Sequence, residues 1–304
     1  MLNLRGVIVP IATPMNESGD IDPIGTAKLL TYVIKGGVSG IFALGSTGEF
    51  SSLTHNQKKA FVELVAKELR GKVSLYVGIS STCDPEMVES ANEAKAFGAD
   101  AVVVMPPFYF SFANQSTVAD YLENLADRMP LPMVLYNSSG GKGNLLTSET
   151  VARLAHHPKI VGIKDTSGNF RALLSIVVAT RNSDKPFAIL PGNDFQMAPS
   201  VLFGTSGGVN SLANVAPRLF VDAYQAAISH DLTGLGDVVT PNSNLARIHT
   251  LCELYQVPPN AITTIKSALS LMGICGETVA KPLEAMNDDG RKKIRSILEK
   301  IGLL

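Results

Sequence analysis

The chain has 304 residues, of which 45% are hydrophobic and 17% are charged, and its formal net charge is −1. This balance includes no basic run of the kind that binds nucleic acid, and no apolar segment approaches the roughly 18 residues that a membrane-spanning helix needs. The cysteines, Cys83, Cys252 and Cys275, are odd in number and widely spaced, and the amino terminus lacks the long apolar region of a signal peptide, so we expect a reducing, cytoplasmic location.

Short apolar runs recur along the first three quarters of the chain. Each is rich in Val, Ile or Leu and is bounded by Gly, Pro, Ser, Thr or Asn, which is typical of a strand buried on both faces. We therefore expect strands at Gly6–Ala12, Gly40–Leu44, Val73–Ile79, Ala101–Met105, Pro132–Tyr136, Ile160–Lys164, Phe187–Pro191 and Gly207–Ser211.

Amphipathic stretches separate these runs. Apolar residues recur with helical period in Pro23–Lys35 and Asn56–Leu69, and Asp84, followed by Pro85 and Glu86, is a typical helix start. Alternating strands and helices indicate a parallel sheet with crossover helices. Because no glycine-rich nucleotide fingerprint follows the first strand, we expect a closed (β/α)8 TIM barrel instead of an open doubly wound sheet.

The alternation ends near residue 233. The remaining residues are predicted to form helices only, near Leu235–Tyr255, Pro259–Met272 and Asp289–Ile301. We therefore expect a barrel over residues 1–232 and C-terminal helices, residues 233–304, packed on it.

Lys164 ends the apolar run that begins at Ile160 and is followed by a turn signal, Asp165-Thr166-Ser167-Gly168. In a TIM barrel the chemistry takes place at the carboxyl ends of the strands. Burial disfavours the ammonium form of a lysine, and the free amine is the nucleophilic form. We interpret Lys164 as a nucleophile; the alternative is a lysine whose amine reaches solvent at the end of the strand.

Three other strand ends are unusual. The second strand ends in Gly-Ser-Thr-Gly-Glu, residues 45–49. Its two hydroxyls, together with backbone amides left accessible by the glycines, could bind a carboxylate; the alternative is an ordinary turn. The fifth ends at Tyr136, which is either a proton-transfer group or a residue at the edge of the core. The eighth brings paired glycines at 207–208, which let a ligand approach the backbone.

Together these motifs resemble the dihydrodipicolinate synthase / N-acetylneuraminate lyase family of pyruvate-dependent class I aldolases. Gly-Ser-Thr-Gly-Glu, Tyr-Asn and Gly-Ile-Lys-Asp-Thr-Ser occur in the family's order and at compatible spacing, over nearly the whole chain. The resemblance implies a (β/α)8 barrel with a helical tail, commonly a homotetramer. It also implies a Schiff base between a lysine and a 2-oxo acid, with no metal or dissociable cofactor.

The resemblance implies a role for each matching residue. Lys164 would form the Schiff base, and Tyr136 would relay protons. Ser46 and Thr47 would hold the carboxylate of pyruvate beside the reacting atoms. Tyr109 matches a tyrosine that reaches across a subunit interface to complete a proton relay. Four more positions match substrate contacts in the family: Val209, through its carbonyl, and Thr166, Asp194 and Ser211.

Two departures from the family pattern bear on the substrate. The synthases carry an arginine that holds the second carboxylate of the aldehyde, whereas this chain has Gly141, with Lys142 next to it. A lysine does not replace a planar, bidentate guanidinium. In the sialate lyases a glutamate follows the position of Asp194, whereas this chain has Phe195. For Asp194 the alternative is a cap of a helix over Phe195–Phe203.

We therefore expect a lyase or aldolase that cleaves or forms a short 2-keto-3-deoxy sugar acid, or a related 2-oxo acid, with pyruvate and an aldehyde as the other reactants. The alternatives within the family are dihydrodipicolinate (4-hydroxy-tetrahydrodipicolinate) synthase and a dehydratase or deaminase that uses the same imine. A non-catalytic protein that binds pyruvate or another 2-oxo acid is the alternative from a different class.

Overall fold

The predicted strands form one parallel barrel. A computed structural model describes residues 4–138 and 144–304. Neighbouring strands follow the order β7-β6-β5-β4-β3-β2-β1-β8, and the amide of Ser206, just before β8, donates to the carbonyl of Ile189 in β7 at 2.9 Å, which brings the two sheet edges together. The strands are β1 (Gly6–Pro10), β2 (Gly40–Ala43), β3 (Ser74–Gly78), β4 (Ala101–Val104), β5 (Met133–Asn137), β6 (Ile160–Asp165), β7 (Ala188–Pro191) and β8 (Gly207–Val209).

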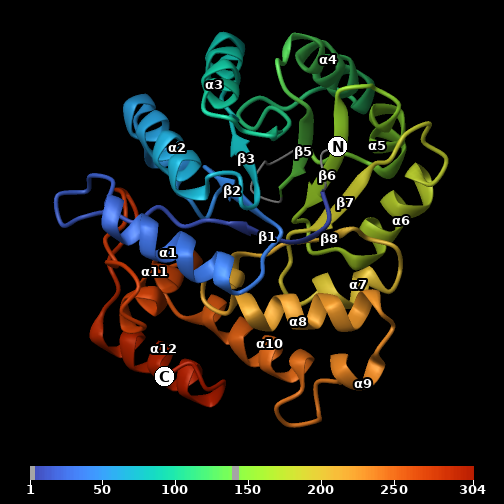
Figure 1. Cartoon of the computed structure of the whole chain (residues 1–304). Helices are drawn as coiled ribbons and strands as arrows, with labels where there is room; N and C mark the ends of the chain where they lie inside the picture. Colours follow the sequence, from blue (N-terminus) through green and yellow to red (C-terminus); the bar gives the residue numbers. More distant parts are fainter. Residues whose placement is uncertain (1–3, 139–143) are drawn as a thin grey trace.

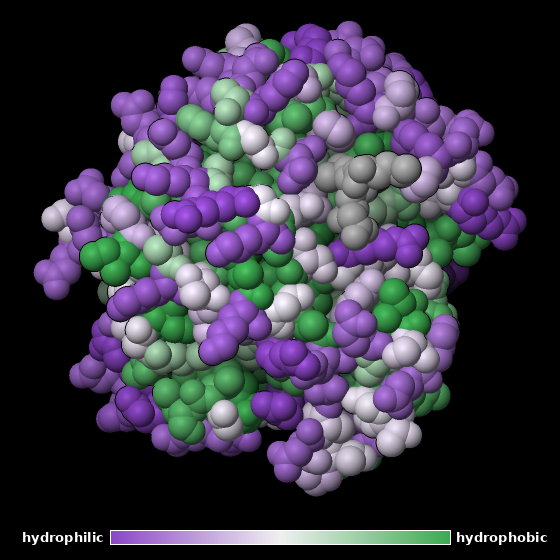
Figure 2. Space-filling view, in the orientation of Figure 1, coloured by the Kyte–Doolittle hydropathy of each residue, from purple (hydrophilic) through white to green (hydrophobic). Residues whose placement is uncertain are grey.

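Helices surround these strands, as Figure 1 shows, and the (β/α)8 prediction is confirmed. Hydrophilic side chains dominate the outline of the molecule in Figure 2, where the outer faces of the helices meet solvent. In the described part of the chain, no helix combines the length and apolar character needed to cross a membrane. The barrel helices are α1 (Pro23–Lys35), α2 (His55–Leu69), α3 (Asp84–Ala96), α4 (Gln115–Arg128), α5 (Ser148–Ala155), α6 (Phe170–Thr180), α7 (Met197–Val201) and α8 (Pro217–Ile228).

The alternation of side chains along each strand creates two separate apolar clusters. In β2, Phe42 points into the barrel and joins Ile8, Tyr76 and Val134 in the interior cluster. Its neighbours in the chain point outward into the larger cluster between strands and helices. Because both faces of each strand are buried, the strands read as continuous apolar runs in the sequence.

The predicted start of α3 at Asp84 is confirmed, and Cys83 is its N-cap. The Asp84 carboxylate accepts hydrogen bonds from Tyr121 and Arg128 of α4, both at 2.5 Å. One predicted helix is wrong. The predicted helix Leu235–Tyr255 is interrupted, because Gly236 takes a left-handed conformation with φ of 69° and the chain becomes helical again only at Asn244.

The C-terminal helices gather on one side of the barrel, next to α1 and α8 (Figure 1). They are α9 (Leu232–Leu235), α10 (Asn244–Cys252), α11 (Ala261–Leu271) and α12 (Asp288–Lys300), with the 3-10 turn η3 (Glu253–Gln256) after α10. Two further 3-10 turns, η1 (Phe50–Ser52) and η2 (Ser211–Asn214), follow β2 and β8. The division of the chain at residue 232 stays a prediction.

A buried ion pair ties these helices to the barrel. The Lys266 amine of α11 lies 2.7 Å from the Glu49 carboxylate, and both side chains have 0% exposure. Lys266 also donates to the carbonyl of Thr13 at 2.8 Å, and the amide of Ala280 donates to the second Glu49 oxygen at 2.7 Å. Burial lowers the pKa of Lys266, and the Glu49 carboxylate partly offsets this effect. Glu49 itself has a left-handed backbone with φ of 61°, so the turn after β2 is held by its own side chain.

We predict that Lys266→Met destabilises the protein by about 3–5 kcal/mol, because it leaves the Glu49 charge buried without its partner. The measurement is the midpoint of urea unfolding. A matched control is Lys292→Met, which removes a lysine whose pairing with Asp289 is exposed and contributes little to stability. Equal midpoints for the two variants would show that the buried pair does not stabilise the fold.

Candidate active site

Lys164 lies inside the mouth of the barrel. It stands directly beside Tyr136 in the register of β6 and β5, and its side chain is only 4% exposed. The amine nitrogen is 4.1 Å from the centre of the Tyr136 ring and 5.2 Å from the centre of the Phe42 ring. The alternative reading, in which this amine reaches solvent, is therefore wrong.

A glycine leaves room for this side chain. Gly192 follows β7, and a Cβ atom added there would lie 2.9 Å from Lys164 Cε and 2.5 Å from Thr166 Oγ1. A methyl group at residue 192 would thus displace both side chains. Sequence analysis did not single out Gly192, although it directly follows the end of a predicted strand.

Beneath Lys164 the barrel holds a small apolar cavity. Apart from the lysine, its lining comes from the interior cluster. Val209, a predicted substrate contact, lies in this lining and is buried. The lining residues are Leu4, Ile8, Phe42, Tyr76, Val103, Val134, Lys164, Leu190 and Val209.

Tyr136 is buried at the end of β5, and its hydroxyl lies 3.4 Å from the Ser46 hydroxyl. Burial by itself raises the pKa of this phenol. The positive charge of Lys164 counteracts this effect of burial because it favours the phenolate, and the nearby hydroxyls of Ser46, Thr166 and Ser138 act in the same direction. Together they lower the Tyr136 pKa to about 8, so the structure brings Lys164, Tyr136, Ser46 and Thr166 together.

The two neighbouring hydroxyls of the turn after β2 have different partners. Whereas Ser46 faces Tyr136, the Thr47 hydroxyl lies 2.8 Å from the Ser211 hydroxyl, which follows β8. The turns after β2 and β8 are therefore joined at the mouth, and the predicted site residue Ser211 belongs to the same group.

Asp194 is also buried in this region, with an exposure of 2%. It does not cap α7, whose N-cap is Gln196, so the capping alternative is wrong. One carboxylate oxygen accepts hydrogen bonds from the Tyr255 hydroxyl and, at 3.4 Å, from the amide of Leu212. Burial raises the Asp194 pKa to about 6, and these hydrogen bonds and the charge of Lys164 limit the rise.

Asn137 and Asp165 fix the ends of β5 and β6. The Asn137 amide donates to Asp165 at 2.8 Å, and the same side chain accepts from the amide of Leu146 at 2.9 Å. The other Asp165 oxygen accepts from the Ser167 hydroxyl at 2.6 Å. Sequence analysis gave neither residue a role, although each directly follows a predicted catalytic residue.

Among the described site residues, Tyr109 is not brought to this group within one chain. Tyr109 lies in the surface loop between β4 and α4, with 77% exposure, and its ring packs edge-on against Phe110 at 4.9 Å between centroids. Gly141 and Lys142, which bear on the missing arginine, lie outside the described residues.

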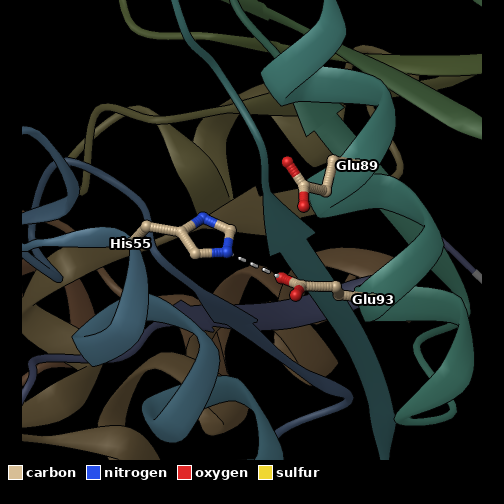
Figure 3. A group of neighbouring side chains, drawn as sticks. All are labelled: His55, Glu89 and Glu93. Atoms are coloured by element: carbon tan, nitrogen blue, oxygen red, sulfur yellow. Dashed lines mark ion pairs between the residues drawn. The ribbon is translucent and has the colours of Figure 1, made fainter.

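A separate cluster on α2 and α3 contains three potential metal ligands, His55, Glu89 and Glu93 (Figure 3). Their nearest ligand atoms lie within 4.8 Å of one another, and His55 Nε2 is 3.6 Å from Glu93. However, the Lys59 amine is 2.8 Å from Glu93 and already neutralises that carboxylate. We therefore assign these residues to a surface ion-pair group.

Comparison with known proteins gives a consistent family assignment. The profile of the dihydrodipicolinate synthetase family matches residues 3–301. A 4-hydroxy-tetrahydrodipicolinate synthase of Gluconacetobacter diazotrophicus is 32% identical over 302 residues, which cover 99% of this chain and 98% of the relative. YjhH of Escherichia coli K12, a probable 2-dehydro-3-deoxy-D-pentonate aldolase, is 31% identical over 310 residues, covering 100% and 99%.

Solved structures agree with this result. Dihydrodipicolinate synthase from Bacteroides thetaiotaomicron has a TM-score of 0.92 and 33% identity, and the match covers 98% of this chain and 99% of that one. YagE of E. coli K12, solved in complex with pyruvate, has a TM-score of 0.92 and 28% identity, with 100% of both chains covered. The chain thus belongs to the dihydrodipicolinate synthetase family, whose members are lyases and aldolases that act through a Schiff base.

Proposed function

We propose that this enzyme cleaves, or in reverse forms, a short 2-keto-3-deoxy sugar acid, with pyruvate and a hydroxylated aldehyde as the other reactants. The main support for this proposal is the buried Lys164 amine, which lies 4.1 Å from the centre of the Tyr136 ring. The same mouth of the barrel also contains hydroxyl groups and the Asp194 carboxyl. A buried amine beside a phenol of lowered pKa suits imine chemistry with proton transfer.

In this mechanism the Lys164 amine adds to the C2 carbonyl of the substrate and water leaves, which gives an iminium. Tyr136, as phenolate, removes the proton of the C4 hydroxyl. The C3–C4 bond then breaks, its electron pair flows into the iminium, and an aldehyde and an enamine result. Protonation of the enamine at C3, followed by hydrolysis of the imine, releases pyruvate and regenerates the amine. Ser46 and Thr47 hold the carboxylate of the pyruvyl part, and the backbone carbonyl of Val209 faces the substrate.

The polar groups on the aldehyde side favour a hydroxylated substrate. Asp194, Thr166 and Ser211 are suited to hydrogen bonding with hydroxyls, whereas the Asp194 carboxylate repels a second carboxylate. Gly141 in place of the synthase arginine points in the same direction. The similarity to a probable pentonate aldolase supports this substrate class.

The second candidate is 4-hydroxy-tetrahydrodipicolinate synthase. It is favoured by the names of two relatives, which are 32% and 31% identical to this chain. That reaction joins pyruvate to an aldehyde that carries its own carboxylate, and it needs a cation opposite that group. A dehydratase or deaminase would use the same imine without breaking a carbon–carbon bond.

We also propose that the enzyme is a cytoplasmic homotetramer. The exposed Tyr109–Phe110 pair presents a large aromatic surface, and burial of such a pair against a second subunit is favourable. Tyr109 would thereby complete the proton relay of a neighbouring subunit. The three cysteines are unpaired, which fits a reducing compartment.

Treatment with pyruvate and borohydride is expected to attach one reduced pyruvyl group per chain, at Lys164, because reduction traps the imine. Mass spectrometry of the digested protein locates the label. Lys164→Arg is expected to remain unlabelled. A matched control is Lys159→Arg, since the Lys159 amine instead donates to backbone carbonyls of residues 127 and 129. Label on another lysine would exclude the proposed nucleophile.

Tyr136→Phe is expected to lower turnover by about 100-fold, the usual effect of losing a general acid–base group, while pyruvate trapping persists. In the unmodified enzyme the phenolate fraction rises as the pH rises through the Tyr136 pKa of about 8. The kcat/KM for cleavage should therefore increase through that pH and then level off. This ionisation should be absent in the variant; a profile that retains it would assign it to another group.

The substrate class is tested by the ratio of two kcat/KM values in the unmodified enzyme. We expect cleavage of 2-dehydro-3-deoxy-D-pentonate to exceed condensation of pyruvate with aspartate semialdehyde, because a missing bidentate partner costs about 2–5 kcal/mol. Gly141→Arg should raise the condensation rate. A ratio that favours the semialdehyde by about tenfold or more would instead support the synthase.

A further inference from the structure

Tyr255 connects the C-terminal helices with the mouth of the barrel. It lies in η3, and 40% of the residue is exposed. Its hydroxyl, however, points inward and donates to Asp194 Oδ2, and the Ser211 hydroxyl lies close enough to lower the pKa of this phenol. The exposed part of the side chain and its buried hydroxyl thus belong to different environments.

The Asp194 carboxyl is held through one of its two oxygens. Oδ2 accepts from the Tyr255 hydroxyl and from the amide of Leu212. Oδ1 is buried and has no hydrogen-bond partner among the described residues. The Asn210 side chain lies close enough to stabilise the charged carboxylate without reaching Oδ1. One oxygen is therefore held by two donors, and the other is left without a hydrogen-bond donor among the described residues.

The same tyrosine also reaches the opposite side of the mouth. Ser211, whose hydroxyl influences the pKa of Tyr255, lies 2.8 Å from the Thr47 hydroxyl. Tyr255 therefore donates directly to Asp194 on the proposed aldehyde side, and it lies near the Ser211–Thr47 pair that reaches the proposed pyruvate side.

From this geometry we propose that Tyr255 is a positioning residue of the active site. It holds the Asp194 carboxyl so that Oδ1 accepts a hydrogen bond from a hydroxyl of the aldehyde part of the substrate. The substrate part of this inference rests on the proposed function. Tyr255 does not touch the reacting atoms; it acts through Asp194 and Ser211.

The charged and titratable groups around Asp194 determine the sign of the expected effect. They are Lys164 on β6, Tyr255 on η3 and Cys252 on α10. Burial and the Asp194 charge raise the Cys252 pKa to about 12, so this thiol stays neutral near pH 7. The bond from Tyr255 stabilises the carboxylate, and its removal would raise the Asp194 pKa further above about 6. Less carboxylate would then be present at neutral pH.

The first experiment needs no substrate. Infrared spectroscopy follows the carbonyl stretching band of the protonated Asp194 carboxyl. The band is assigned to this residue because it is absent from the Asp194→Asn variant. In the unmodified enzyme this band should titrate with a midpoint near the Asp194 pKa of about 6. In Tyr255→Phe the midpoint should lie at least about one unit higher, as expected for a lost hydrogen bond to a charged group. An unchanged midpoint would overturn the proposal.

The second experiment uses the best substrate found among 2-keto-3-deoxy acids. Tyr255→Phe should raise KM at pH 7 about tenfold, with a smaller change in kcat, because the carboxyl is both less well held and less ionised. The part of the defect that comes from lost ionisation should disappear as the pH rises. The double variant with Asp194→Asn should be no worse than Asp194→Asn alone, because the two residues act as one unit. Additive losses would show that Tyr255 acts independently of Asp194 and would contradict the proposal.

Tyr121→Phe is the matched control, since it removes a tyrosine–aspartate bond of the same kind, to Asp84, between α4 and α3. It should change neither the infrared midpoint nor KM. Pyruvate trapping at Lys164 should persist in Tyr255→Phe, which shows that the variant is folded. If no 2-keto-3-deoxy acid is cleaved while trapping persists, the proposed substrate fails, and the infrared titration still decides whether Tyr255 controls Asp194.

Discussion

The buried pair of Glu49 and Lys266 is the constraint on which the site depends. Two charges without solvent are tolerated only when each is paired and hydrogen-bonded, and here Thr13 and Ala280 supply the remaining bonds. The pair fixes the left-handed turn at Glu49, two residues after Thr47 and three after Ser46. Helix α11 thereby contributes to the geometry of the turn that carries the proposed carboxylate-binding hydroxyls.

Within the mouth, one positive charge influences two acids. Lys164 lowers the pKa of Tyr136 and that of Asp194, and burial raises both. The proton affinities of the phenol and of the carboxyl therefore both depend on the charge at the amine. An iminium keeps the positive charge, whereas the enamine does not. The mouth thus differs electrostatically between the stages of the proposed reaction.

The sequence predicted the strands well because a strand buried on both faces needs an almost continuous apolar run. Lys164 and Tyr136 could be identified as candidate site residues because each ends such an apolar run. The prediction of one helix over Leu235–Tyr255 was wrong because apolar residues continue past Gly236 in the sequence. The backbone of Gly236 ends the short helix α9 there. The contacts of Tyr255 and Lys266 were missed for another reason: their partners lie 61 and 217 residues away. No local pattern marks such contacts, because they depend on how the C-terminal helices pack.

The apolar cavity beneath Lys164 has a consequence for the order of events. Because that floor offers the amine only hydrocarbon and aromatic neighbours, water has no favourable route to the imine from below. In the proposed reaction, water would therefore enter through the same opening by which the aldehyde departs. While the aldehyde occupied the opening, the carbon–nitrogen bond would be protected from hydrolysis. Release would then be ordered, with the aldehyde leaving first and pyruvate second, and the enamine would have time to be captured by another aldehyde before water arrived.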